Sequence, residues 1–99
     1  MTDKELLELA AKAAGYEWNW FGANFHIAID ERRYTSWNPL TDDGDALRLA
    51  VKLHLDIHVD SNLTEVIYLN QTTEAHLGDP YAATRRAIVR AAAEIGKTL

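Results

Sequence analysis

The chain has 99 residues, of which 47% are hydrophobic, and it carries 10 Lys and Arg against 15 Asp and Glu, a formal net charge of −5. This length predicts one domain, residues 1–99, with an ordinary hydrophobic core, and the apolar content excludes a disordered chain. The absence of cysteine excludes disulfides, thiol catalysis and cysteine-ligated zinc, and the acidic balance argues against a general binder of nucleic-acid phosphates.

The N-terminal segment predicts a helix over residues 3–14. Thr2 and Glu5 are spaced as a capping box, and apolar residues then recur at three- and four-residue spacing. Gly15 supplies the left-handed residue that ends such a helix.

Alternating aromatic and polar residues then predict a hairpin. Strands are expected over residues 16–20 and 25–29, joined by a loop at residues 21–24. A short third strand is expected at residues 34–37. Asn38 and Pro39 end it, because proline gives no ladder donor and restricts the residue before it.

The second half of the chain predicts two helices around a group of strands. Acidic side chains at residues 41–45 suit the positive end of a helix that runs to about residue 54. Three strands are expected at residues 55–60, 66–69 and 72–77. Asp79 as the cap and Pro80 at the first helical position begin a last helix toward Leu99.

The order α-β-β-(β)-α-β-β-β-α with short connections predicts an α+β domain. We expect an antiparallel sheet of about four to six strands with three helices packed on it, similar to an α/β/α sandwich. Small side chains in the last helix predict close packing against its neighbours. They are Ala82, Ala83, Ala87, Ala91, Ala92 and Ala93.

Three segments carry a family resemblance: residues 5–16, the motif WNPLTDD at residues 37–43 with Ala46, and DPYAATRRAI at residues 79–88. In this order and spacing the chain resembles, over nearly its full length, small bacteriophage proteins of the phage ABA-sandwich domain family. The resemblance implies an α/β/α sandwich encoded by a phage or prophage. The family has no agreed activity, so no catalytic residue is carried over. The polar face of the strand at residues 55–60 departs from this pattern, because it predicts one solvated side of the sheet.

Imidazole and carboxylate side chains alternate along the strand expected at residues 55–60 and share one of its faces. They are His54, Asp56, His58 and Asp60. Such ligands suit zinc, nickel or iron, and His26 or His76 from a neighbouring strand would complete the site. The alternative is a solvated sheet face, since residues two apart on a strand lie roughly 7 Å apart. The metal candidates are therefore His54, Asp56 and His58.

Aromatic residues gather in the hairpin region. Those proposed as a binding surface are Trp18, Trp20, Phe21, Tyr34 and Trp37. Aromatic side chains are enriched at recognition surfaces. The alternative is that they form the core, in whole or in part.

Basic residues cluster in the last helix and in one turn. Arg85, Arg86 and Arg90 lie on the helix, and Arg32 and Arg33 lie in the turn. Arginine binds phosphate and carboxylate well, so these residues predict an anion site if they meet. The alternative is a solvated helix face.

Catalytic motifs are absent from the sequence: it has no Gly-x-Ser-x-Gly elbow and no glycine-rich phosphate loop. We therefore expect a small phage-derived accessory protein, without enzymatic activity or cofactor, that binds a protein of the phage or the host and can form a homo-oligomer. No apolar run approaches the ~20 residues of a membrane span, so a cytoplasmic location is expected. Two alternatives remain: a small-ligand or nucleotide-binding module, and a metal-dependent enzyme.

Overall fold

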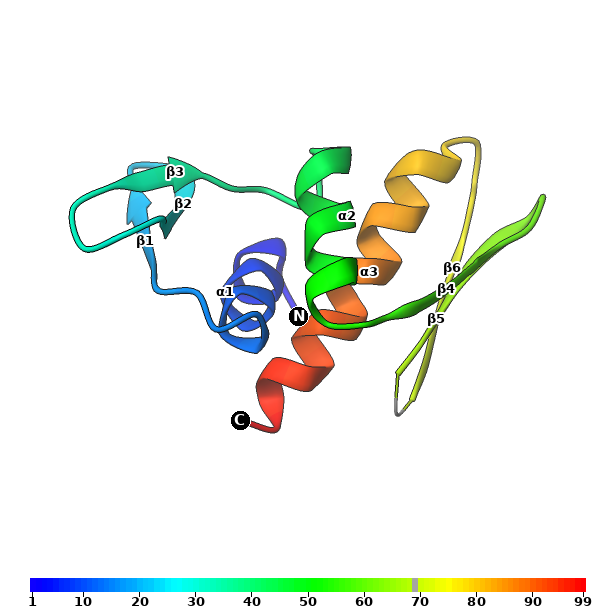
Figure 1. Cartoon of the computed structure of the whole chain (residues 1–99). Helices are drawn as coiled ribbons and strands as arrows, with labels where there is room; N and C mark the ends of the chain where they lie inside the picture. Colours follow the sequence, from blue (N-terminus) through cyan, green and yellow to red (C-terminus); the bar gives the residue numbers. More distant parts are fainter. Residues whose placement is uncertain (69) are drawn as a thin grey trace.

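The computed structural model of the chain describes residues 1–68 and 70–99. In chain order its elements are α1 (Asp3–Ala13), β1 (Trp18–Phe21), β2 (Asn24–Ala28), β3 (Tyr34–Ser36), α2 (Asp43–Lys52), β4 (Asp56–Val59), β5 (Leu63–Ile67), β6 (Gln71–Ala75) and α3 (Pro80–Lys97). The strands form two antiparallel sheets, β1-β2-β3 and β4-β5-β6, and the helices lie between them (Figure 1). In the part of the chain described, no helix has the length and apolar character needed to cross a membrane.

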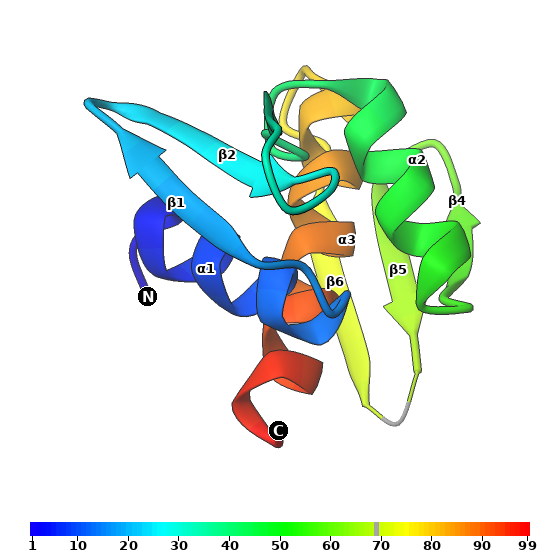
Figure 2. The same ribbon diagram turned by 60° about the vertical axis from the view of Figure 1, so that its left-hand side comes forward.

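Helix α3 is the centre of the core. It packs against α1, against α2 and against strands β5 and β6 (Figure 2). The small residues on α3 permit this packing, as the sequence predicts: Ala87, Ala92 and Ala93 are completely buried. Gly96 lies so close to α1 that a Cβ atom there would overlap the carbonyl oxygen of Leu9.

The predicted caps fix where the helices begin. Thr2 Oγ1 accepts the backbone N–H of Glu5, whose carboxylate accepts the N–H of Thr2, which confirms the capping box. Asp42 and Asp79 each accept the backbone N–H of the residue three positions on, at 2.8 and 3.0 Å. Pro80 follows at the start of α3, as expected.

The first hairpin is tighter than the sequence predicts. Phe21 and Asn24, expected in a loop, are strand residues that pair with each other across a two-residue turn. Gly22 makes this turn with a φ of 62°, a conformation that glycine adopts without a steric penalty. Strand pairing therefore fixes the side of the sheet on which the Phe21 side chain lies.

The α+β class with antiparallel strands and three helices is confirmed, but the strands divide between two sheets. A single sheet with helices on it was expected; instead, helices separate two small sheets (Figure 1). The segment from Trp37 to α2 explains the division. Trp37 is buried, and Asn38 donates its backbone N–H to Asp45 at the start of α2, which directs the chain away from β3.

Candidate functional site

The β1–β3 sheet has an inner face made of tryptophan and aliphatic side chains. Its register places Trp18 beside Ile27 and Trp20 beside Phe25. The ring centroids of Trp18 and Trp20 lie 5.6 and 4.8 Å from that of Phe25. Trp37 packs behind them, 5.8 Å from Phe25, and is only 4% exposed.

The inner face is tied to α1. Trp20 Nε1 donates a hydrogen bond to the Glu8 carboxylate at 2.9 Å, and the Lys4 ammonium lies 5.2 Å from the Trp20 ring centroid. Of the residues predicted as a binding surface, Trp37 therefore belongs to the core and Trp20 packs on a helix. Trp18 stays 39% exposed at the edge of the sheet.

The outer face of the same sheet carries a second aromatic group, Phe21, His26 and Tyr34, which we call the outer aromatic cluster. The Phe21 ring makes edge contacts with the rings of His26 and Tyr34, at centroid distances of 4.7 and 5.7 Å. Phe21 is 46% exposed and Tyr34 is 39% exposed. Two of the five predicted surface residues thus meet on one side, together with a histidine.

The turn before β3 holds Tyr34 at one end of this cluster. Asp30 accepts the backbone N–H groups of Arg32 and Arg33 at 2.9 and 3.0 Å, and it also pairs with the Arg33 guanidinium at 2.8 Å. The N–H of Arg32, followed by the side chain of Arg33, lowers the pKa of the Asp30 carboxyl group. The turn is therefore ordered by its own charges, and Figure 1 shows it projecting from the sheet.

The predicted anion site is divided among three ion pairs. Arg85 binds Asp43 at 2.6 Å and donates to the carbonyl of Leu40 at 2.9 Å. Arg86 binds Asp3 at 2.8 Å, and Arg90 binds Glu74 and the carbonyl of Thr73. The three arginines thus connect α3 to α2, α1 and β6 in turn. Arg86 and Arg90 line one pocket, but Glu74 and Glu94 line it too, so it does not offer an anion two free guanidinium groups.

The predicted metal ligands also fail to converge. His54 lies in the turn after α2 with a φ of 56°, so it is not on the strand. Asp56 and His58 lie on β4 with a contact of 3.3 Å between carboxylate and imidazole, and both are exposed. Over residues 1–68 and 70–99, no group of three His, Asp or Glu side chains is placed to hold a metal ion.

The two histidines expected to complete that site serve elsewhere. His26 belongs to the outer aromatic cluster, in the other sheet. His76 Nε2 lies 2.9 Å from the hydroxyl of Thr64, which in turn lies 2.8 Å from the hydroxyl of Thr84 on α3. Since Thr64 is completely buried, this chain of hydrogen bonds satisfies polar groups between β5 and α3.

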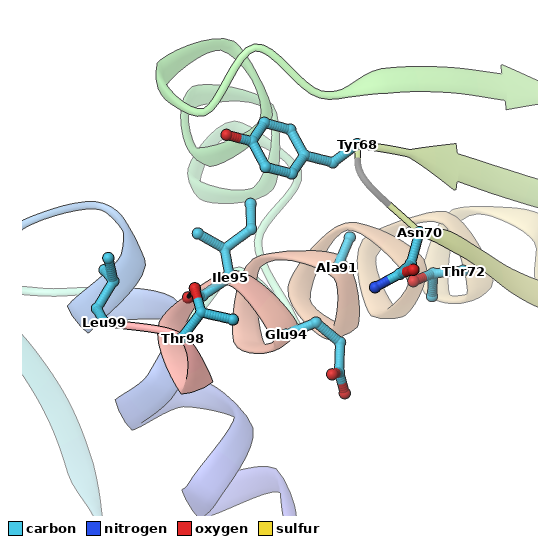
Figure 3. Close-up of a pocket in the computed structure, with 8 residues that line it drawn as sticks. All are labelled: Tyr68, Asn70, Thr72, Ala91, Glu94, Ile95, Thr98 and Leu99. Atoms are coloured by element: carbon cyan, nitrogen blue, oxygen red, sulfur yellow. Dashed lines mark hydrogen bonds between the residues drawn. The ribbon is translucent and has the colours of Figure 1, made fainter.

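A pocket of about 200 Å³ lies where the end of β5 faces the last turns of α3. Tyr68 lies across from Ile95, while Glu94 points away from Tyr68 and pairs with Lys97 at 3.0 Å (Figure 3). The Thr98 hydroxyl already donates to the carbonyl of Ile95 at 2.7 Å. Since none of the described residues that line it is basic, the pocket does not match a phosphate ligand.

The sequence predicts the outer aromatic cluster only in part. His26 is assigned only to the candidate metal site, whereas Phe21 is proposed as a surface residue but is placed in a loop and not on a strand. Because side chains alternate along a strand, His26 must lie on the face of β2 opposite the buried side chains. The sequence alone therefore indicates the face on which His26 lies. The position of Phe21 depends on the two-residue turn, which composition does not reveal.

Comparisons with protein-family models, with curated proteins and with solved structures find no match for this chain.

Proposed function

We propose that this protein acts by binding another protein through the outer aromatic cluster, and that it catalyses no reaction. The observation that carries the proposal is the exposure of Phe21 and Tyr34, which contact each other on the outer face of the β1–β3 sheet. Two large rings held in place by strand pairing are preorganised, so they lose little conformational freedom when a partner covers them.

The surroundings of the cluster match the general plan of a protein interface, an apolar centre with a polar rim. The register places polar side chains on the same face, namely Asn19, Asn24 and Ser36. Complete burial of a Phe-sized side chain contributes about 1.5–3 kcal/mol. Phe21 and Tyr34 are therefore the expected energetic centre of the contact.

The charges of α3 favour a protein partner over a nucleotide. A nucleotide site would need Arg85, Arg86 and Arg90 to converge, whereas each of them binds a separate carboxylate. Their role in the proposal is to hold α3 against its neighbours.

The resemblance to the phage ABA-sandwich domain family supplies the biological setting of the proposal. The protein would be a small phage or prophage accessory protein whose partner is a phage or bacterial host protein in the host cytoplasm. A second copy of the chain that binds through the same cluster would form a homo-oligomer. The experiment first distinguishes this case from binding of a different protein.

The test uses site-specific photocrosslinking in a bacterial host. A benzoylphenylalanine at position 21 is expected to crosslink one partner, whereas the same group at position 77 is not. Leu77 is a matched control because it is 93% exposed and lies in the turn before α3, away from the hairpin sheet. The mass of the product distinguishes a second copy from another protein.

Binding of the purified partner then measures the role of the cluster. We expect the Phe21→Ser/Tyr34→Ser variant to lose about tenfold or more in affinity, and Leu77→Ser to bind as the unchanged protein does. Equal affinities for all three proteins would contradict the proposal, as would a strictly monomeric chain that crosslinks nothing at position 21.

A further inference from the structure

The inner face of β4, the first strand of the second sheet, is only partly covered: Ile57 packs against the core, whereas Val59 is 57% exposed. Helix α3 covers β5 and β6, and α2 lies in front of the β4 side (Figure 2). Between α2, β4 and the start of α3 lies a groove of about 490 Å³. Ile57 and Val59 of β4 form one wall, Leu47 of α2 forms another, and Ile88 of α3 lies at the base.

The groove is apolar, and three large side chains at its rim are exposed to solvent. Leu47 is 62% exposed, Val59 is 57% exposed and Tyr81 is 70% exposed. Ile88, in contrast, is 4% exposed and joins the groove to the core. The exposed rim and the buried base together offer an apolar ligand side chains to contact.

Strand β4 offers backbone hydrogen bonds beside the groove. It is an edge strand, paired only with β5 in the order β4-β5-β6. Asp60 donates its backbone N–H to the carbonyl of Leu63 at 3.0 Å, so these two residues are a hydrogen-bonded pair. Along an antiparallel ladder, hydrogen-bonded and non-hydrogen-bonded pairs alternate. By this alternation, the backbone groups of Ile57 and Val59 point to the free edge. An extended chain can therefore pair with β4 and place every second side chain toward the groove.

Acidic side chains surround the end of the groove where α3 begins. Asp43 lines it, Asp79 immediately precedes the lining residue Pro80, and Asp60 immediately follows Val59. Arg85 is the one basic residue of the lining, and Asp43 and a backbone carbonyl already occupy it. Because this ion pair also neutralises Asp43, a ligand that places a positive charge at this end gains electrostatic attraction from Asp60, from Asp79 and from a chain of net charge −5.

We propose that this groove binds an extended, apolar segment of a partner protein that carries an adjacent Lys or Arg, added as a fourth strand on β4. A second copy of the chain fits less well, because its net charge is −5 and its own β4 segment is bounded by Asp56 and Asp60. The site is separate from the outer aromatic cluster, which lies across the helices from it (Figure 1).

The test uses synthetic peptides as probes. The first is a capped peptide of alternating Thr and Val with two lysines at its N-terminus, the end that meets the acidic residues in antiparallel pairing. The second has two glutamates in place of the lysines. The third is the lysine peptide with N-methyl groups on alternate backbone nitrogens, which removes the ladder donors. Backbone amide shifts in nuclear magnetic resonance spectra report the site, and titration gives the affinity.

We expect the lysine peptide to shift the amides of Ile57 and Val59, and the glutamate and N-methyl peptides to bind at least about tenfold more weakly. Leu47→Ser removes an exposed apolar wall and is expected to weaken binding by about tenfold. Asp79→Asn keeps a good N-cap while it removes one charge, so it is expected to weaken only the lysine peptide.

Three outcomes would overturn the proposal: no shift on β4 at millimolar peptide, equal binding of the lysine and glutamate peptides, or full affinity of the N-methyl peptide. The remaining measurement is made on the chain alone. Sedimentation would detect a dimer, and a dimer that also protects the Ile57 and Val59 amides would assign the groove to a second copy. The Phe21→Ser/Tyr34→Ser variant is expected to bind the lysine peptide normally, so failure of either proposed surface leaves the other measurable.

Discussion

Acidic side chains stabilise local structure by accepting backbone N–H groups, and in three of them this contact lowers the pKa of the carboxyl group. Glu5 accepts the N–H of Thr2, Asp30 that of Arg32, and Asp60 that of Asn62. In each case this hydrogen bond is the main reason that the pKa of the carboxyl group lies below its ordinary value. The ionised form therefore stabilises a helix start and two turns, one of which adjoins the outer aromatic cluster.

These carboxyl groups predict a loss of stability in acid. Because their pKa values are lower in the folded than in the unfolded chain, their contribution is complete above the unfolded pKa, about 4 for these groups, and is lost as the pH falls through the folded values. We expect the thermal midpoint to be steady near neutral pH and to fall below about pH 4. The Asp30→Asn/Asp60→Asn variant should show a shallower fall, measured by circular dichroism between neutral and acid pH. An equally steep fall in this variant would contradict the assignment.

Residue roles are predictable from the sequence where the cause is local. Thr2 and Asp79 cap helices as predicted, because a cap depends on the next three residues. The roles of the arginines are not local. Arg86 is paired with Asp3 from the other end of the chain, and this partner follows only from the packing of α1 on α3. The same holds for Trp37, whose burial depends on Tyr16 and Phe25.

At the scale of elements, the contact of α1 with α3 is the tightest feature of the fold. The two helices approach until the backbone of Leu9 occupies the space where a side chain at position 96 would begin. Glycine is unfavourable inside a helix by about 1 kcal/mol relative to alanine. Its presence here is explained by the close approach.

Gly96→Ala is expected to destabilise the protein. Overpacking costs typically about 1–3 kcal/mol, which outweighs the gain in helix propensity because the obstructing atoms belong to the backbone of Leu9 and cannot rotate away. We expect the free energy of unfolding in urea to decrease by about 2 kcal/mol. Gly44→Ala in α2 is the control, since a Cβ there meets only the side chains of Arg48 and Asp42. A loss of stability in the control as large as in Gly96→Ala would refute the explanation.

Helices were easier to predict than strands for a physical reason. The caps and the spacing of apolar residues locate both ends of each helix to within two residues. Strand ends depend on pairing. Leu63 and Thr64 lie outside the strands that the sequence predicts, yet Leu63 pairs with Ala75 and Thr64 is a completely buried strand residue. Both positions follow from the partner strand, which the local sequence does not identify.

At the scale of the whole molecule, two small sheets stand on either side of the helices (Figure 1). Whether six strands form one sheet or two depends on which edges meet, and periodicity carries no information on this. The order of the elements and the antiparallel hairpins were therefore predictable, whereas the division into two sheets of three strands each was not. The division also separates the two proposed binding surfaces.

The two sheets are expected to unfold together. All three tryptophans lie in or beside the β1–β3 sheet, so their fluorescence reports that sheet, while far-ultraviolet circular dichroism reports mainly the helices. Phe25, Ile27 and Trp37 belong to the same buried cluster as the core residues of α3. The two signals should therefore change at the same urea concentration. A fluorescence transition at lower urea would show instead that the first sheet opens independently.

The helix that joins these parts is synthesised after all the elements that it joins. Until residues 80–97 emerge from the ribosome, α1, α2 and the strands β5 and β6 lack the surface on which they pack. The apolar side chains of these elements therefore stay uncovered until α3 has been made, and the core cannot form before then.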